Sequence, residues 1–383
     1  MPGPRLRHNV VTRATVLLAC FAIGTMAAAA GSAAETPEPA GTASIISELG
    51  LRVAADPVRE RAGWKPPREI LVDSEIHADL PRLKQIAPHV RFVEVSATTR
   101  ASDIADADAV IGICEEKILQ AALHVQWVQL LWAGVERCVQ QPSIRERHPL
   151  VTNMQRAAGA SMAEHVMGMM LILSHHLDYF LLQQGRGHWA TEEDHYPQPV
   201  ELKGKTVLVV GLGGIGTEVA KRAYAFGMRV TATRASGSGG PDYVSYVGSP
   251  DELLKLAKEA DFVVNCTPLT PQTSGLFNKD FFGITKPSTY FINVGRGGSV
   301  VTADLIAALR AGRIAGAGLD VTELEPLPAD SPLWHMNNVM ITPHVSAYTP
   351  MADDTRLAIL EENLRRYIGG EPMLSVVDID RGY

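Results

Sequence analysis

The chain has 383 residues, of which 46% are hydrophobic and 20% charged, and its formal net charge is −7. This length favours two domains, and the lack of a basic face or a Lys/Arg run argues against binding to nucleic acid. The four cysteines, Cys20, Cys114, Cys138 and Cys266, do not have the spacing of a metal site, and only three follow the N-terminal leader. We therefore expect neither a metal site nor a disulfide framework.

The first 34 residues have the pattern of a secretory signal peptide. Basic residues between Arg5 and Arg13 precede an uncharged apolar stretch at 14–30, and Ser32-Ala33-Ala34 fits a small-residue cleavage site. The pattern predicts an exported protein, periplasmic or secreted, with no stable membrane insertion after cleavage. The alternatives are an uncleaved membrane anchor and, if the leader is misassigned, a cytoplasmic protein.

Residues 46–150 predict a smaller α/β domain. Short apolar runs at 69–72, 91–95 and 109–113 are strand candidates separated by helical patterns. A second domain is expected over residues 151–344. The helical pattern at 349–368 is expected to return to the first domain, so that residues 345–383 complete it.

A glycine fingerprint marks the second domain. Val207-Leu208-Val209-Val210 predicts a buried strand, and Gly211-Leu212-Gly213-Gly214-Ile215-Gly216 follows it and leads into a helical pattern. In this setting Gly211 permits a tight turn, Gly213 lets the backbone approach a pyrophosphate, and Gly216 allows the helix to pack closely on the strand. The predicted cofactor contacts in this turn are Gly211, Gly213, Gly214, Ile215 and Gly216.

The residue at the end of the next predicted strand indicates which dinucleotide binds. It covers residues 228–233 and ends where this type of fold usually has an acidic residue for the ribose hydroxyls. Arg234 stands there instead, with Ser236 two residues later. Because a guanidinium can pair with a 2′-phosphate, we expect NADP(H) in preference to NAD(H). The alternative is a solvated arginine beside a pocket that also accepts NAD.

Three polar residues follow further strand candidates. Arg296 lies between glycines after the run 289–294, Glu325 lies in the loop after 318–321, and His344 follows Ile341-Thr342-Pro343. The carboxyl ends of strands are where open α/β sheets bind ligands. Taken singly, these residues could be a strand-end cap, a loop acid and a structural histidine.

Together these segments resemble the D-isomer-specific 2-hydroxyacid dehydrogenase family, over nearly the whole chain after about residue 50. The resemblance rests on several motifs in the right order: Val209–Gly216, Asn265–Thr273, Asn293–Gly297, Leu319–Val321 with Glu325-Pro326, and Thr342-Pro343-His344. It implies a Rossmann-type doubly wound parallel sheet for the nucleotide domain and a smaller flavodoxin-like α/β substrate domain. It also implies an active site in the cleft between them and a homodimer formed through the nucleotide domain.

The resemblance assigns catalytic roles to three residues. Arg296 would bind the carboxylate and carbonyl of the substrate. His344 would protonate the carbonyl oxygen as hydride arrives, or act as the base in the reverse direction. Glu325 would hydrogen-bond the imidazole and favour its protonated form.

Further binding residues are implied by the same resemblance. Asp320 is similar to an acid near the nicotinamide carboxamide, and Thr267 and Pro268 would line the cofactor groove. In the first domain, the substrate loop would be formed by Trp132, Ala133 and Gly134. In this loop Glu136 stands where the family often has aspartate, which we interpret as a structural substitution. No metal is expected, because His165, His175 and His176 do not share one helix face.

The leading functional prediction is an NADP(H)-preferring reductase of a 2-oxo acid such as glyoxylate, hydroxypyruvate or a larger analogue. An NAD-linked dehydrogenase of another acid is the alternative within the enzyme class. A non-catalytic nucleotide-sensing protein on the same scaffold is the alternative outside it. The sequence leaves open which acid is used and how an exported enzyme would obtain its cofactor.

Overall fold

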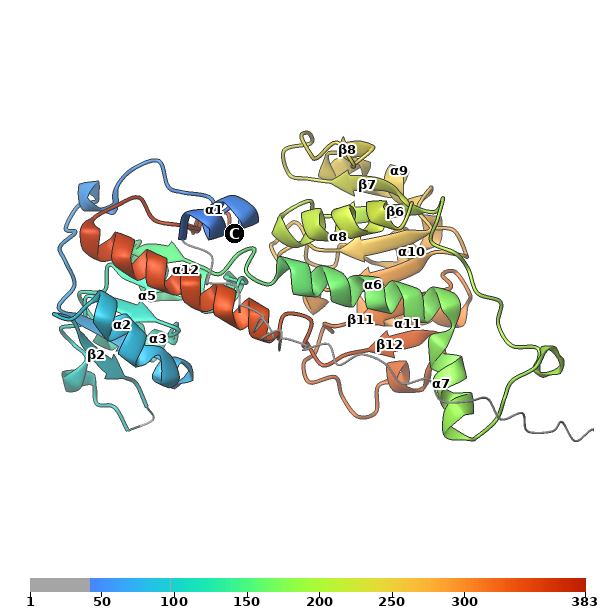
Figure 1. Cartoon of the computed structure of the whole chain (residues 1–383), viewed down its shortest axis with the longest axis horizontal. Helices are drawn as coiled ribbons and strands as arrows, with labels where there is room; N and C mark the ends of the chain where they lie inside the picture. Colours follow the sequence, from blue (N-terminus) through green and yellow to red (C-terminus); the bar gives the residue numbers. More distant parts are fainter. Residues whose placement is uncertain (1–41, 97) are drawn as a thin grey trace, which may run out of the picture. The chain divides into compact units, whose positions relative to one another are not determined.

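The computed structural model describes residues 42–96 and 98–383 (Figure 1). The predicted signal peptide at residues 1–34 lies outside this range. Within it, no helix has both the length and the apolar character needed to cross a membrane. Two parallel sheets, each covered by helices on both faces, make up most of the described chain.

The first sheet has five parallel strands in the order β2-β1-β3-β4-β5. This is the flavodoxin-like order, in which the chain reverses direction beside β1. The strands are β1 (Glu69–Val72), β2 (Arg91–Glu94), β3 (Ala109–Ile111), β4 (Trp127–Gln129) and β5 (Leu150–Thr152). Side chains alternate between the faces along each strand. Ile70 and Val72 therefore belong to one apolar cluster and Leu71 to another.

Helices from both ends of the described chain cover this sheet. On the face of Ile70 lie α2 (Leu80–Ile86) and the C-terminal α12 (Pro350–Gly369), with α1 (Thr42–Leu49) packed beside α12. Tyr367 of α12 stacks on Trp127 with ring centroids 4.6 Å apart. The other face carries α3 (Glu116–Ala121), α4 (Glu136–Val139) and α5 (Pro142–Arg147). The last helix of the chain thus helps to form the core around its first sheet.

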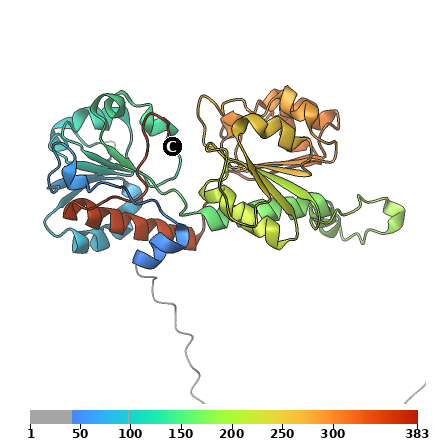
Figure 2. The same ribbon diagram turned by 90° about the horizontal axis from the view of Figure 1, so that it is seen from above.

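The second sheet has seven parallel strands in the order β12-β11-β10-β9-β6-β7-β8. They are β6 (Thr206–Val210), β7 (Arg229–Thr233), β8 (Tyr246–Gly248), β9 (Phe262–Asn265), β10 (Tyr290–Asn293), β11 (Gly316–Leu319) and β12 (Val339–Ile341). Val207 and Val209 pack under α6 (Gly159–His175) and α8 (Gly214–Ala225). Leu208 and Val210 pack on the opposite face against α9 (Leu253–Ala257), α10 (Lys279–Ile284) and α11 (Thr302–Arg310). The doubly wound parallel sheet predicted from the sequence is confirmed (Figures 1 and 2).

Two local features connect these elements. The segment Ser249-Pro250-Asp251-Glu252 forms a capping box, with the Ser249 side chain and the Glu252 carboxylate satisfying each other's backbone N–H groups. After α6 the chain continues into α7 (Leu177–Gly185) and a long loop that leads to β6. Leu181, Leu182 and Trp189 of this α7 arm are exposed.

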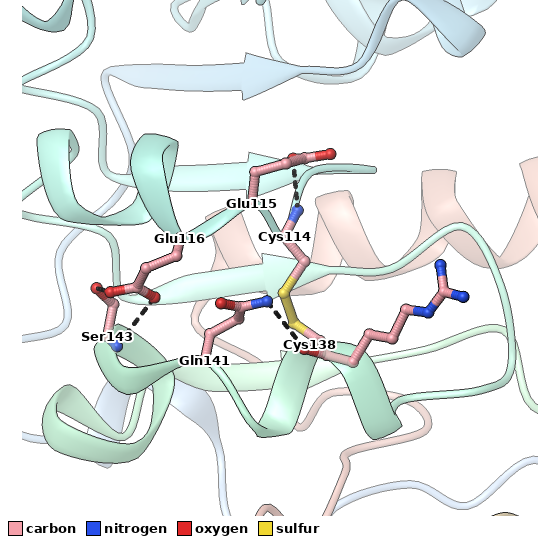
Figure 3. Close-up of a disulfide and its surroundings, with 7 residues drawn as sticks. Cys114, Glu115, Glu116, Cys138, Gln141 and Ser143 are labelled. Carbon is pink, nitrogen blue, oxygen red and sulfur yellow. Dashed lines mark hydrogen bonds between the residues drawn. A yellow bond between two sulfur atoms is a disulfide. The ribbon is translucent and has the colours of Figure 1, made fainter.

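Cys114 and Cys138 are bonded to each other, a disulfide that the expectation of no disulfide framework did not foresee (Figure 3). The two residues are 24 positions apart in the sequence. β3 and β4 are neighbouring parallel strands, so the segments that leave their carboxyl ends meet. Cys114 follows β3 and Cys138 lies on α4 after β4, which brings their Cα atoms within 5.5 Å. Such proximity permits a disulfide, and cysteine counting alone could not show it.

Reducing this disulfide should lower the stability of the fold. Closing a loop of this size removes unfolded-state entropy worth about 3 kcal/mol. We expect a reductant to lower the thermal unfolding midpoint of the wild-type protein. The double variant Cys114→Ser/Cys138→Ser should have the lower midpoint already and show no further response. An equal response of both proteins to the reductant would contradict a stabilising role for the bond.

Candidate active site

The topology gathers the predicted site segments along one edge of the second sheet. All seven strands are parallel, so their carboxyl ends lie at the same edge. The glycine turn follows β6 and Arg234 follows β7, on one side of the point where the strand order reverses. Thr267, Arg296, Asp320 and His344 follow β9, β10, β11 and β12 on the other.

His344 and Glu325 form a direct pair. The imidazole Nδ1 donates to Glu325 Oε2 at 2.8 Å, and the side chains are 47% and 39% exposed. The second carboxylate oxygen of Glu325 accepts from the Thr322 backbone N–H at 3.1 Å. In the described chain no hydrogen bond uses His344 Nε2. The arrangement therefore fixes one ring nitrogen and leaves the other free to exchange a proton with a ligand.

Asp320 holds the loop that carries His344. Its buried carboxylate accepts hydrogen bonds from Thr342 Oγ1 at 2.7 Å and from the backbone N–H groups of Val345 at 2.9 Å and Ser346 at 3.2 Å. Burial by itself would raise the pKa of the Asp320 carboxyl, but these hydrogen bonds outweigh it and the pKa is lowered. The carboxylate thus braces the backbone of His344, which has a φ of 56°. A contact between Asp320 and the nicotinamide stays a prediction.

The side chain of Arg296 is oriented by Glu136, which lies on a helix that packs on the first sheet. Its Nε forms an ion pair with Glu136 at the start of α4, and its Nη1 donates to the Gly295 carbonyl at 2.7 Å. Its Nη2 lies directly over Gly134, where a Cβ would be only 1.8 Å away. No other hydrogen bond of this guanidinium occurs in the described chain. Both Nη2 hydrogens and one Nη1 hydrogen therefore remain for a ligand.

The backbone around Arg296 is held by a buried polar network that sequence reasoning missed. Asn293 Nδ2 and Ser299 Oγ both donate to the Arg296 carbonyl, at 3.2 and 2.6 Å. Asn265 Nδ2 in turn donates to Asn293 Oδ1 at 2.9 Å and to Ser299 Oγ at 2.7 Å. The sequence signal was the position of both asparagines at strand ends, where each begins a motif of the family resemblance. Their amides fix the loop that presents the guanidinium.

The Arg296 loop and the His344–Glu325 pair are close neighbours. A Cβ on Gly297 would lie 1.8 Å from the Thr322 carbonyl oxygen, so the two loops are in backbone contact. Thr322 is also the residue whose N–H binds Glu325. Arg296 and the His344–Glu325 pair therefore lie on neighbouring loops at this edge of the sheet.

The predicted substrate loop lies beside Arg296. The carbonyl of Trp132 accepts from the Met154 N–H at 3.2 Å, and the carbonyl of Ala133 accepts from Asn153 Nδ2 at 2.7 Å. The N–H groups of Ala133 and Gly134 take part in no hydrogen bond of the described residues. The Trp132 side chain is 42% exposed. The loop therefore offers free backbone donors next to the guanidinium, and binding of substrate there stays a prediction.

The glycine turn has the geometry of a phosphate cradle. Gly211 has a φ of 94°, a backbone conformation that residue types with a side chain rarely adopt. A Cβ on Gly216 would lie 2.2 Å from the Gly211 carbonyl oxygen. Gly213, at the N-terminus of α8, has no atom within 4 Å of its Cβ position. Side chains are thus excluded from the turn while the helix N-terminus stays open. These residues fit the pyrophosphate of a dinucleotide.

The remaining predicted cofactor residues surround this turn. Thr267 donates to Asn265 Oδ1 through both its backbone N–H and its hydroxyl, and its methyl lies 3.1 Å from a Cβ position on Gly211. Arg234 Nη1 donates to the Gly239 carbonyl at 3.0 Å, and Ser236 Oγ to that of Ser238 at 2.9 Å. Ile215 is half-buried in α8 and Pro268 is exposed. The structure brings these residues near the turn without testing their contact with a cofactor.

No group of three or more potential metal-ligating side chains occurs among residues 42–96 and 98–383. His165 instead forms a hydrogen bond between Nε2 and Thr342 Oγ1 at 2.9 Å. It thus belongs to the hydrogen-bond network around Asp320.

A parallel α/β sheet with an open glycine turn, an arginine and a histidine–glutamate pair at one edge defines a dinucleotide-binding oxidoreductase. Known proteins agree with this class. Residues 167–346 match the model of the NAD-binding domain of D-isomer-specific 2-hydroxyacid dehydrogenases. The glyoxylate/hydroxypyruvate reductase A of Photorhabdus laumondii is 34% identical over 66% of this chain and 80% of that protein. The D-3-phosphoglycerate dehydrogenase of Methanocaldococcus jannaschii is 30% identical over 81% of this chain, which spans 59% of that longer protein.

A solved structure is similar over the same range. It is an NADPH-dependent glyoxylate/hydroxypyruvate reductase of Sinorhizobium meliloti in complex with NADP and sulfate. Its TM-score is 0.71 at 27% identity, covering 82% of this chain and 99% of that one. The chain belongs to the D-isomer-specific 2-hydroxyacid dehydrogenase family, and it is an NAD(P)-dependent oxidoreductase.

Proposed function

We propose that this enzyme reduces a small 2-oxo acid of the glyoxylate or hydroxypyruvate type to the D-2-hydroxy acid, with NADPH preferred over NADH. The observation that carries the proposal is the His344–Glu325 pair, whose free Nε2 lies at the same sheet edge as the open donors of Arg296. A carbonyl reduction needs a cation beside the substrate and a proton donor for the carbonyl oxygen. The names of the Photorhabdus and Sinorhizobium relatives support the substrate class.

The chain's own residues account for binding and proton transfer. The free Nη hydrogens of Arg296 hold the substrate carboxylate and polarise the adjacent carbonyl. A bound reduced nicotinamide supplies the hydride. The proton for the resulting alkoxide comes from His344 Nε2, while Glu325 keeps the ring oriented through Nδ1 and stabilises the imidazolium. In the oxidative direction the same nitrogen accepts the hydroxyl proton.

The test is turnover of the purified protein with NADPH and NADH against a panel that contains glyoxylate, hydroxypyruvate, 3-phosphohydroxypyruvate and larger 2-oxo acids. Oxidation of NADPH with glyoxylate or hydroxypyruvate supports the proposal. Strong preference for 3-phosphohydroxypyruvate would favour the activity named for the Methanocaldococcus relative. Cofactor binding without any turnover would favour the nucleotide-sensing alternative.

Arg234 should decide the cofactor preference. It stands at the carboxyl end of β7, half-buried, and among the described residues no carboxylate forms an ion pair with it. Arg234→Asp should weaken NADPH binding because it places a negative charge beside the 2′-phosphate, and it should favour NADH through its ribose hydroxyls. The measurement is the ratio of kcat/KM for the two cofactors. An unchanged ratio would contradict this assignment.

We also propose a homodimer in which a second copy covers the exposed apolar side chains of the α7 arm. Leu181 and Leu182 are each 62% exposed and Trp189 is 89% exposed, and large exposed apolar side chains on one arm favour an interaction surface. The molar mass in solution tests the proposal. Trp189→Asp together with Leu182→Asp should produce a monomer, and a monomeric wild-type protein would contradict it.

Export is proposed from the leader together with the disulfide. A Cys114–Cys138 bond is of the kind that persists in oxidising compartments. Fractionation of cells tests the proposal, with processed protein outside the cytoplasm as the expected result. Full-length protein in the cytosol would contradict it.

A further inference from the structure

Arg156 has a conformation that the fold does not otherwise explain. It lies between β5 and α6 and has a φ of 74°, a region that arginine seldom adopts. Its side chain crosses the glycine turn so closely that a Cβ on Gly214 would be 2.5 Å from Arg156 Cγ. The turn needs glycine at 211 and 216 for its own geometry, whereas a side chain at 214 would collide with this arginine. Strained residues of this kind cluster at ligand sites.

The charge of Arg156 is not neutralised within the described chain. Its Nη1 donates to the Leu49 carbonyl at 3.0 Å, and no carboxylate forms an ion pair with it. Burial lowers the pKa of the Arg156 guanidinium, and the neighbouring charges of Arg52 and Arg234 lower it further. Glu218 acts in the opposite direction, but it forms an ion pair with Arg222. The positive charge of Arg156 is thus left without a carboxylate partner among the described residues.

The position of Arg156 points to the anion that would balance its charge. Gly214 is the first residue of α8, a helix of 12 residues whose open N-terminus fits a pyrophosphate. Arg234 lies at the end of β7, where the adenosine ribose of a dinucleotide is expected. The side chain of Arg156 is therefore next to the pyrophosphate position, and that of Arg234 next to the 2′-phosphate position.

We propose that Arg156 binds the pyrophosphate of the cofactor and so acts on NADPH and NADH alike, while Arg234 distinguishes between them. The proposal rests on the proposed use of a dinucleotide. It assigns an arginine that lies outside the nucleotide-binding fingerprint, in the segment after β5. This residue would place its guanidinium on a phosphate oxygen, which is a strong charge-assisted contact.

The test compares the dissociation constants of NADPH and NADH for the wild-type protein, Arg156→Asn and Arg234→Asp. Asparagine is chosen at 156 because it tolerates positive φ. Arg156→Asn should weaken the binding of both cofactors by roughly 10-fold or more, leaving their ratio unchanged. Arg234→Asp should change the ratio. Arg310→Gln, on the exposed end of α11, is the matched control.

Unchanged binding of both cofactors in Arg156→Asn would overturn the proposal. A loss confined to NADPH would overturn the pyrophosphate assignment, since it would place Arg156 on the 2′-phosphate.

A second measurement separates this proposal from the proposed function. Inorganic pyrophosphate should raise the thermal unfolding midpoint of the wild-type protein and have much less effect on Arg156→Asn. If the wild-type protein binds neither dinucleotide, the proposed function fails, yet this difference would still support the anion site. A purely structural Arg156 predicts a lower midpoint in the variant with an equal response to pyrophosphate, and that result would overturn the proposal. No stabilisation of the wild-type protein by pyrophosphate would overturn it too.

Discussion

Replacing His344 with alanine should lower kcat for 2-oxo acid reduction by about 10²- to 10⁴-fold, the usual contribution of a general acid. The imidazole Nδ1 is hydrogen-bonded to Glu325, so Nε2 is the ring nitrogen left to give a proton to the substrate. Cofactor binding should stay nearly unchanged, because none of the predicted phosphate contacts involves His344. The measurements are steady-state kinetics and a direct titration with NADPH.

Two further variants sharpen this result. His89→Ala is the matched control and should keep full activity, because His89 is exposed and its side chain forms no hydrogen bond with the residues that the structure describes. The activity of Glu325→Gln should lie between those of His344→Ala and His89→Ala, because an amide can still contact the ring but lacks the charge that stabilises an imidazolium. Wild-type turnover in His344→Ala would rule out the mechanism.

Replacing Arg296 with lysine should lower kcat/KM for the 2-oxo acid by about 10- to 100-fold, in line with the loss of a charged hydrogen bond. Lysine keeps the charge, but it lacks the planar fork that binds Glu136 through Nε and leaves Nη2 free. The semi-buried carboxylate of Glu136 would also lose its partner. The titration of NADPH should be little affected. Arg310→Lys, exposed on α11, serves as the control.

Glu136→Gln separates orientation from charge at the same position. It keeps Arg296 intact but removes the ion pair that directs the guanidinium. We expect a smaller loss of kcat/KM than in Arg296→Lys, because the free Nη hydrogens are still present but less well positioned. A kcat/KM in Arg296→Lys equal to that of the wild type would show that the guanidinium does not bind the substrate.

The sequence by itself determined the fold class and the order of the site segments. Buried parallel strands have short apolar runs in the sequence, such as Val207–Val210. The residues of the turn that follows each strand come directly after this run in the chain. Because parallel strands share one carboxyl edge, the segments around Arg296 and His344 could be placed together without coordinates. The hydrogen bond between Glu325 and His344 was expected from the family resemblance and is present.

The contacts that only the tertiary structure decided join residues far apart in the sequence. Glu136 and Arg296 are separated by 160 residues. Glu136 lies on α4, which packs on the first sheet, and Arg296 lies in the loop after β10 of the second sheet. Cys114 and Cys138 meet because β3 and β4 are neighbours, and Arg156 reaches Gly214 because α6 packs on α8. Local patterns record which face of an element is apolar, but not which elements pack together. The packing of the whole fold therefore decides which ion pairs, disulfides and close backbone contacts form.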